Sequence, residues 1–363
     1  MAVTTFPEAP FEFAMFDWIE NSGRPVADIV EHKMRLVEMA DRAGFYAWHT
    51  AQHQATPLSL NISPSILLAA AIQRTQNLHV GALTFCLPWY DPYRFYNEVC
   101  MLDQMSRGRV ELGVGRGISL LESSVYGIDD VEESRGRYRE TLDIFFNACG
   151  KDTLEHEGNY FNYHDVELHT APYQKPYPPL WFPSSSPDII DFVARHGYNT
   201  AIPGAPENVR PMLEQYRETW LEHQDDEGRH NAHVAAPRLG RNQHIFVAET
   251  DAEAEAIAGP AMAEWAAHIS HLSRKHSASL TAAPQPDRST RVVIAGSPET
   301  VAERLIESIE VSGINYCILV FSFGDLPPER SERSLELFIS DVMPAVRAGL
   351  DPDGTASASG HGA

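Results

Sequence analysis

Hydrophobic and polar positions follow two repeating patterns along the chain. Short, nearly continuous apolar runs predict strands buried on both faces, and segments with apolar residues every three or four positions predict helices. The predicted strands cover residues 11–18, 45–50, 78–87, 109–115, 180–183, 199–202, 244–248 and 316–323. The predicted helices cover residues 29–40, 66–73, 93–105, 135–148, 187–195, 208–223, 251–267, 297–311 and 335–346.

The alternation of strands with helices predicts the fold class. Strands that alternate with helical segments form parallel sheets, because each helix carries the chain back to the start of the next strand. Eight strand–helix units in one chain favour a closed (β/α)8 barrel, the TIM barrel, with inserted loops. The alternative is a doubly wound open sheet, which usually carries a glycine-rich dinucleotide turn after its first strand. This sequence has no such turn there.

We expect residues 1–350 to form a single barrel domain. Within it, residues 153–170 predict an inserted hairpin that turns at Gly158-Asn159. Residues 268–292 lack periodicity, and we interpret them as a long insertion or loop. Residues 351–363 are rich in Gly, Ser and Ala, which is typical of a disordered tail.

Composition and charge narrow the possible functions. The 363 residues are 43% hydrophobic and 21% charged, as in ordinary globular proteins. The formal net charge of −22 argues against binding to nucleic acid or to an anionic membrane, because both need a basic face. The four cysteines form no CxxC motif, and no apolar run is long enough to span a membrane. The chain also begins without a secretory signal pattern, so we expect a cytoplasmic protein.

Candidate functional residues follow the predicted strands, because the catalytic face of an α/β barrel lies at the carboxyl ends of its strands. His53 follows the second strand and can exchange a proton near neutral pH; an idle surface histidine is the alternative. Residues 113–117, Gly-Val-Gly-Arg-Gly, end the fourth strand. Their small side chains would let a flat ligand or a phosphate approach the backbone, while a tight turn with a solvent-facing arginine is the alternative.

Two further groups of polar residues are candidate sites. Residues 184–186, all serine, end the fifth strand and open a helix, whose free N–H groups suit a phosphate. Simple N-capping by Ser186 is the alternative interpretation. His268, His271 and His276 lie close in sequence but lack an HExxH spacing and a carboxylate partner, so we expect no metal site.

Taken in order, several motifs resemble those of the bacterial luciferase-like flavin monooxygenases, and of the luciferase α subunit in particular. The most specific stretch is residues 78–117, LHVGALTFCLPWYDPYRFYNEVCMLDQMSRGRVELGVGRG, which includes LDQMSRGR at residues 102–109. The other matches, in chain order, are VYG at 125–127, Ser134-Arg135, AGSPET at 295–300 and DVMP at 341–344. The resemblance extends over roughly residues 10–347.

This resemblance implies a (β/α)8 barrel that binds reduced FMN at its carboxyl-terminal mouth. Arg116, Arg135 and the helix start at Ser185 and Ser186 would hold the FMN phosphate, and such a set of donors suits a dianion. Gly115 and Gly117 flank Arg116 and are predicted to belong to the same cofactor site.

The resemblance also assigns roles on the flavin ring side. Leu83 and Thr84 match the place where the family has a non-prolyl cis peptide bond beside the flavin, and we expect both to contact the cofactor. His53 matches the family's catalytic histidine, and we expect it to act in turnover rather than in holding the fold. This chain departs from luciferase at three places. Gln52 and Gln54 flank His53, Gly115 stands where luciferase has its reactive cysteine, and Ser185 stands where luciferase has an acidic residue. Light emission is therefore not implied.

The function implied by the resemblance is an FMN-dependent monooxygenase with two components. A separate flavin reductase would supply reduced FMN, and O2 and a small organic substrate would react at the barrel mouth. Two chains would pair as a homodimer through residues 89–101, where relatives pair their subunits. Two alternatives stay open: hydride transfer from a reduced 5-deazaflavin on the same barrel, and a non-catalytic flavin-binding subunit.

Overall fold

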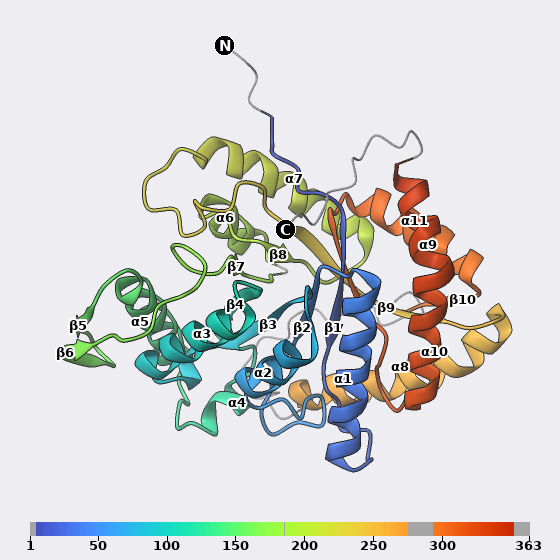
Figure 1. The fold of residues 1–363 in the computed structure, drawn as a ribbon, viewed down its shortest axis with the longest axis horizontal. Coiled ribbons are helices and arrows are strands. Elements are labelled where there is room, and N and C mark those ends of the chain that lie inside the picture. Colours follow the sequence, from blue (N-terminus) through green and yellow to red (C-terminus); the bar gives the residue numbers. More distant parts are fainter. Residues whose placement is uncertain (1–4, 185, 275–292, 352–363) are drawn as a thin grey trace.

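The computed structural model describes residues 5–184, 186–274 and 293–351. Within these ranges, a nine-stranded sheet forms the centre of the molecule, with helices around it (Figure 1). Its strands are β1 (Glu12–Asp17), β2 (Ala47–Thr50), β3 (His79–Cys86), β4 (Val110–Gly115), β7 (Leu180–Trp181), β8 (Thr200–Ala201), β9 (Leu239–Val247), β10 (Val293–Gly296) and β11 (Tyr316–Val320).

The strand order closes the sheet into a barrel and confirms the predicted fold class. The parallel order runs β9, β11, β1, β2, β3, β4, β7, and β8 pairs with β9. A parallel bridge between Trp181 and Asn199 joins the β7 segment to the β8 segment, which completes the ring. Among the described residues, each strand from β1 to β4, and β7, β8, β9 and β11, therefore has a neighbour on both sides, as barrel closure requires.

The region of β9 differs from the sequence prediction. β9 begins at Leu239, earlier than the predicted start at residue 244. Its first half pairs with β11, and its second half pairs with β10, a strand that the sequence analysis did not predict. The early part of β9 was missed because it contains Arg241 and Gln243, which are buried here and bonded to each other at 2.6 Å.

The helices surround the barrel and connect successive strands (Figure 1). They are α1 (Val26–Ala43), α2 (Pro64–Arg74), α3 (Pro92–Ser106), α4 (Leu120–Ser124), α5 (Val131–Ala148), α6 (Pro187–Arg195), α7 (Pro206–His223), α8 (Asp251–Arg274), α9 (Pro298–Ser312), α10 (Pro328–Leu337) and α11 (Met343–Leu350). Local signals explain their ends: the Asp91 side chain caps α3, and Gly44 adopts a left-handed φ of 77° after α1.

The predicted insertions can be compared with the structure in part. The hairpin is confirmed as β5 (Thr153–Glu157) paired with β6 (Asn162–Glu167), and it projects at the left of Figure 1. Helix α8 continues to Arg274, past its predicted end at residue 267. Residues 275–292 of the predicted insertion and residues 352–363 of the predicted tail lie outside the described residues.

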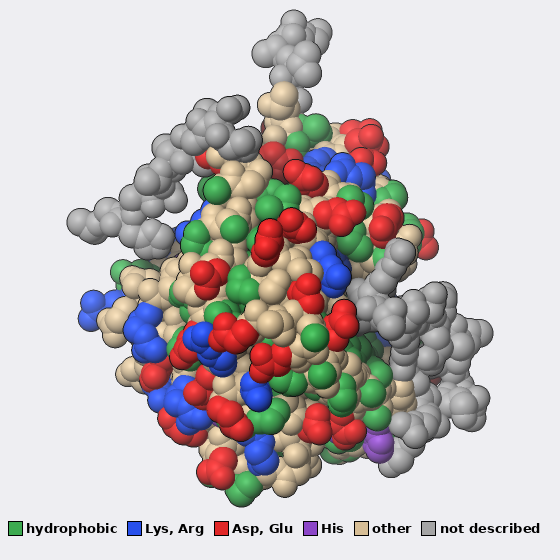
Figure 2. All heavy atoms as spheres, turned by 90° about the vertical axis from the view of Figure 1, so that its right-hand side faces the viewer, with side chains coloured by type: hydrophobic (Ala, Val, Ile, Leu, Met, Phe, Trp, Pro, Cys, Tyr) green, Lys and Arg blue, Asp and Glu red, His purple; other side chains and the backbone are tan. Residues whose placement is uncertain are grey.

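The outer surface carries charges of both signs. On the face shown in Figure 2, acidic and basic side chains are interspersed rather than separated. Ion pairs link elements at the surface: Arg330 of α10 pairs with Glu253 of α8, and Arg333 of α10 pairs with Glu249. None of the described helices combines the length and the apolar composition that a membrane crossing requires.

Candidate functional site

Three of the predicted site residues follow strands of the barrel at the same end. β2, β3, β4 and β7 are adjacent in the sheet, and the chain leaves each of them at its carboxyl end. His53 follows β2, Arg116 follows β4, and Ser186 follows β7. The parallel pairing therefore brings these residues to the same mouth of the barrel, where α/β barrels carry their active sites.

The peptide bond between Leu83 and Thr84 is cis, as the resemblance predicted. The register between β3 and β4 shifts next to it, between Ala82 and Phe85. A Cβ atom at Gly115 would overlap the Thr84 hydroxyl. Close packing of β3 on β4 therefore explains Gly115 without a ligand.

His53 is buried, so the interpretation of an idle surface histidine is wrong. Its side chain is 10% exposed, and its Nδ1 lies 2.9 Å from Oε1 of Glu122 in helix α4. The backbone N–H of Gln54 donates to the same oxygen at 2.9 Å. The His53 ring also stacks on Trp18, with ring centroids 5.7 Å apart. Its contacts mean that His53 contributes to the fold as well, which the sequence analysis did not expect.

The loop that carries His53 is held by the two glutamines beside it. The side-chain amides of Gln52 and Gln54 both donate to the carbonyl oxygen of Ile62. The Gln52 side-chain oxygen accepts a hydrogen bond of 2.8 Å from the backbone N–H of Cys86, at the end of β3. These bonds fix the β2 exit against the β3 exit, and so they fix His53 relative to the Leu83–Thr84 bond.

Arg116 follows β4, and Arg135 in α5 is near enough for its charge to act on Arg116. Burial lowers the pKa of Arg116, and the positive charge of Arg135 lowers that pKa further. Arg135 is half-exposed on α5 and pairs with Glu132 at 2.5 Å. Two guanidinium groups that repel each other suit a doubly charged anion, because the anion would accept hydrogen bonds from both and offset their repulsion.

The third predicted phosphate contact is the start of α6. Ser186 is the residue before the first turn, but its side chain makes no capping hydrogen bond, so simple N-capping by this hydroxyl is not observed. Its backbone N–H donates to the Ser184 hydroxyl at 3.2 Å. Ser185 lies outside the described residues. This uncapped helix start follows β7, the neighbour of the strand that precedes Arg116, and free N–H groups at a helix start suit a phosphate.

Aromatic and imidazole side chains form the opposite side of the mouth. Trp18 follows β1 and lies 6.2 Å from Trp265 of α8, centroid to centroid. Trp265 in turn contacts His244 of β9 at 4.5 Å. Burial lowers the pKa of His244 to about 3, so this imidazole is neutral at physiological pH. The wall is therefore mostly apolar, which suits an organic substrate better than a charged one.

A second imidazole–carboxylate pair ties α8 to the barrel. His268 Nδ1 lies 2.8 Å from Oε1 of Glu20, and His268 Nε2 lies 3.2 Å from Glu264. Hydrogen bonding to Glu20 raises the pKa of His268. His276 lies outside the described residues, and the described residues hold no group of three His, Cys, Asp or Glu placed to bind a metal ion.

A hydroxyl, an imidazole and a carboxylate are linked as in a catalytic triad, but the hydroxyl and the imidazole are enclosed by protein. The Ser331 hydroxyl lies 3.0 Å from His32 Nε2, and His32 Nδ1 lies 3.0 Å from Glu332. Ser331 and His32 have no exposed surface between α1 and α10. Because no substrate could reach this hydroxyl, we interpret these three residues as a link between two helices.

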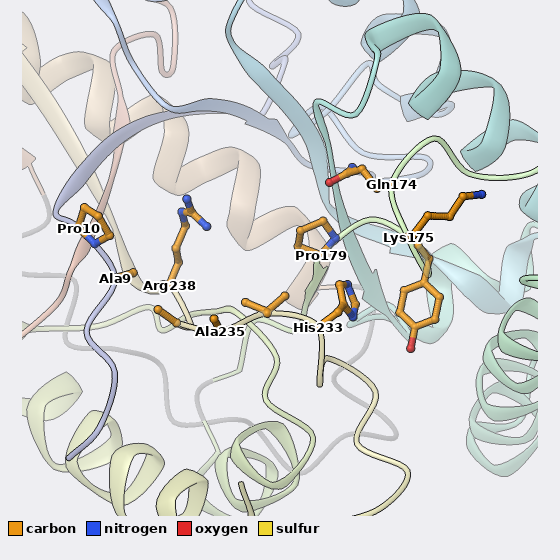
Figure 3. A pocket seen from close by; sticks show the side chains of 11 residues that line it. Ala9, Pro10, Gln174, Lys175, Pro179, His233, Ala235 and Arg238 are labelled. Atoms are coloured by element: carbon orange, nitrogen blue, oxygen red, sulfur yellow. The ribbon is translucent and has the colours of Figure 1, made fainter. Parts of the chain in front are cut away.

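A cavity of about 510 Å³ lies at the other end of the barrel (Figure 3). Its lining includes Pro10, Pro179 and Arg238, which precede β1, β7 and β9. The amino-terminal ends of the strands in α/β barrels serve stability rather than catalysis. None of the predicted site residues lines this cavity, so we assign the function to the opposite mouth.

Glu122 is the site residue that sequence reasoning missed. It lies in the single turn of α4, which the sequence analysis did not predict. The spacing from Ser119 to Glu122 is the S-x-x-E pattern of a capping box, and this pattern could have indicated the helix start. No sequence signal would have connected Glu122 with His53, because 69 positions separate them.

The sequence of this chain is similar to that of a known family of enzymes. The family model described as luciferase-like monooxygenase matches residues 11–316. An uncharacterized protein, y4wF, from Sinorhizobium fredii is 31% identical over 92% of this chain and 97% of its own length. The oxygenase component of a flavin-dependent trigonelline monooxygenase from Acinetobacter baylyi is 24% identical over 87% of this chain and 90% of its own.

A solved structure shows the same fold with a cofactor bound. It is the oxygenating constituent of 3,6-diketocamphane monooxygenase from Pseudomonas putida, a type II Baeyer-Villiger monooxygenase in complex with FMN. The TM-score is 0.76 at 20% sequence identity, over 93% of this chain and 99% of the other. At this identity the likeness establishes the fold alone.

Proposed function

Because the chain belongs to the luciferase-like monooxygenase family, we propose that it uses reduced FMN and O2 to oxygenate a small organic substrate. The observation that carries this proposal is the position of the Arg116–Arg135 pair. Arg116 follows β4 and stands one strand from the start of α6 and two strands from the exit that carries His53. The proposed phosphate donors and the proposed proton-exchanging group would therefore share one mouth of the barrel.

Separate groups of residues would hold the phosphate and the flavin ring of FMN. Arg116, Arg135 and the N–H groups at Ser186 would bind the phosphate, and Ser185 is proposed to join them. Leu83 and Thr84 would lie against the flavin ring, with Gly117 at the turn beside Arg116. Gly117 has a φ of 85°, which favours glycine, and a Cβ there would lie 3.1 Å from the Trp89 ring.

Reduced FMN, when bound, supplies the electrons with which O2 is activated and one oxygen atom is transferred to the substrate. His53 holds or moves a proton at its Nε2 atom, because its Nδ1 is engaged by Glu122. Trp18 stacks on the His53 ring and keeps it away from bulk water. The Trp18–Trp265 wall orients an apolar substrate on the other side of the mouth.

Two protein partners belong to the proposal. The relative from Acinetobacter baylyi is named an oxygenase component, which supports a separate flavin reductase as the source of reduced FMN. A homodimer is supported by the exposed apolar side chains of α2 and α3: Ile66 is 70% exposed and Met101 is 50% exposed. A shallow hollow of about 390 Å³ beside Met101 would receive side chains of a second copy.

The test of this function is the binding of reduced flavins by the full chain under anaerobic conditions. Reduced FMN should bind one per chain, and Arg116→Ala should weaken it by about 1.5–3 kcal/mol, or ~10–150-fold. Reduced riboflavin lacks the phosphate, so the variant should leave its affinity nearly unchanged. The control is Arg195→Ala, at an exposed arginine that pairs with Asp191 at the far end of α6.

Two results would contradict the proposal. An equal loss of affinity for reduced FMN and reduced riboflavin in Arg116→Ala would contradict the assignment of Arg116 to the phosphate. Tight binding of a reduced 5-deazaflavin, with substrate turnover in the absence of O2, would replace oxygenation by hydride transfer on the same barrel.

A further inference from the structure

We infer that Glu122 is a positioning residue for His53: it holds the imidazole in the form protonated at Nδ1 and leaves Nε2 as the nitrogen that exchanges a proton. This inference rests on the proposed function for its meaning in turnover. Its structural content, the protonated nitrogen of the neutral ring, can be measured without any turnover.

The hydrogen bonds at one oxygen of Glu122 determine which nitrogen carries the proton. The backbone N–H of Gln54 can only donate, so Oε1 of Glu122 must accept from it at 2.9 Å. His53 Nδ1 lies 2.9 Å from the same Oε1. A proton on Oε1 would compete with the Gln54 N–H for this position. The imidazole therefore donates from Nδ1–H, and in the neutral ring Nε2 carries a lone pair.

The carboxylate of Glu122 is enclosed by protein. Glu122 has no exposed surface and lies within the single turn of α4. On the other side of the ring, Trp18 stacks on His53 with 25° between the planes. A ring held at one edge and on one face keeps Nε2 in a fixed direction, which general acid–base chemistry requires.

The second oxygen of Glu122 argues against a role in stability alone. Oε2 is buried and has no hydrogen-bond partner among the described residues. A buried carboxylate with an unpartnered oxygen costs free energy, and a neutral or apolar side chain would fill the space more cheaply. The charge has a use, however, when Nε2 takes up a proton, because the carboxylate then stabilises the imidazolium that forms.

The pair formed by Glu20 and His268 shows what a purely structural arrangement looks like. Both oxygens of Glu20 accept hydrogen bonds, one from His268 and one from the backbone N–H of Gly324 at 2.8 Å. Both ring nitrogens of His268 face carboxylates, since Nε2 lies 3.2 Å from Glu264. In contrast, no described side chain is bonded to Nε2 of His53, so this nitrogen is available to a ligand.

The first experiment measures the ring nitrogens of His53 by NMR. Full-length protein labelled with 15N-histidine is used without cofactor, and the His53 signals are assigned by their loss in His53→Gln. At a pH where the ring is neutral, Nδ1 should show the shift of a protonated nitrogen and Nε2 that of an unprotonated one. A neutral ring protonated at Nε2 would overturn the inference, and no Glu122 variant is needed to reach this result.

Variants of Glu122 then test the cause. Glu122→Gln keeps an oxygen that can accept from Nδ1–H, so most of the Nδ1-protonated form should remain. Glu122→Leu removes the acceptor, and the two neutral forms should then mix. Glu20→Gln is the matched control, a buried carboxylate bonded to an imidazole and a backbone N–H, and it should leave the His53 shifts unchanged. Unchanged His53 shifts in a folded Glu122→Leu would overturn the inference.

Kinetics connect the position of the ring to turnover. Removing the charge in Glu122→Gln should lower kcat for coupled oxygenation ~10–100-fold, below the ~10²–10⁴-fold that a positioned acid–base group contributes in total. The KM for substrate and the affinity for reduced FMN should change less than twofold. A wild-type kcat in this variant would contradict the positioning role. Failure of the wild-type chain to bind FMN would instead contradict the proposed function and leave the NMR result standing.

Discussion

Trp181 donates a hydrogen bond of 2.6 Å from its indole Nε1 to the carboxylate of Glu111 inside the barrel. Tyr46 and His79 bond to the other oxygen of Glu111 at 2.5 Å and 3.1 Å. Burial by itself would raise the pKa of Glu111, but the hydrogen bond and charge of His79, with the charge of Arg238, lower it to about 2. A carboxylate thus stays ionised in the middle of the barrel.

Replacing Glu111 should destabilise the barrel. Glu111→Gln removes the charge that His79 and Arg238 face, and we expect a loss of about 3 kcal/mol in the free energy of unfolding. Urea unfolding followed by circular dichroism measures the difference. Glu249→Gln serves as the control, because Glu249 pairs with Arg333 at the surface and should contribute less than about 1 kcal/mol. Equal losses in the two variants would contradict the role given to Glu111.

Stability should fall as the pH is lowered from about 6.5 to about 4. Burial lowers the pKa of several histidines: to about 4 for His32, His49 and His230, and to about 3 for His244. In the unfolded chain these rings have pKa values near 6.5. The unfolded state therefore binds more protons in this window, and the free energy of unfolding decreases as pH falls.

One variant separates this effect from general acid denaturation. The ring of His244 packs edge to face against two aromatic rings, Trp265 and Phe323, so His244→Phe removes a titrating group and keeps an aromatic ring in its place. The slope of unfolding free energy against pH should become less steep by up to one proton, about 1.4 kcal/mol per pH unit. An unchanged slope would show that His244 is not neutral in the folded chain.

The proposed homodimer predicts the result of a charge placed on α3. Wild-type protein should have twice the mass of one chain by light scattering at micromolar concentration. Met101→Glu should yield monomers, because a stable interface needs about 1,000 Å² or more of well-packed surface and excludes unpaired charge from its centre. Val26→Glu, at another exposed apolar residue, should remain dimeric. A monomeric wild type would end the proposal.

The barrel could be predicted because several of its strands are apolar over most of their length. β3 and β11 contain no charged residue, and continuous runs of this kind identify strands covered on both faces. The first half of β9 was missed for the opposite reason. Arg241 donates to the Gln243 side-chain oxygen and to the Ser308 hydroxyl inside the protein, and a sequence cannot show that polar side chains will find buried partners.

The residues of the candidate site that directly follow a strand could be predicted from the sequence. His53 and Arg116 follow strands, and the rule that barrel function lies at strand ends selected both. The burial of His53 was not predictable, because its partners Glu122 and Trp18 come from other loops. The packing against Thr84 that requires glycine at residue 115 was not predictable either, since it depends on the register shift between two strands.

A comparison of two His53 variants should separate its part in turnover from its part in the fold. His53→Gln keeps an N–H group that can reach Glu122 but cannot exchange protons. His53→Ala leaves the buried carboxylate of Glu122 without its side-chain partner. We therefore expect His53→Ala to lose about 3 kcal/mol of stability and His53→Gln to lose about 1 kcal/mol or less.

The two variants should lose coupled oxygenation to the same extent, because neither can pass a proton at the position of Nε2. Product formation per reduced FMN consumed should fall ~10²–10⁴-fold in each, while the affinity for reduced FMN stays within twofold. Electrons that do not reach the substrate should be recovered as released hydrogen peroxide, which a peroxidase assay counts. Full coupled activity in His53→Gln would show that hydrogen bonding to Glu122, and not proton transfer, is what this histidine contributes. Such a result would limit His53 to shaping the β2 exit, and the proton would have to be handled by another group at the mouth.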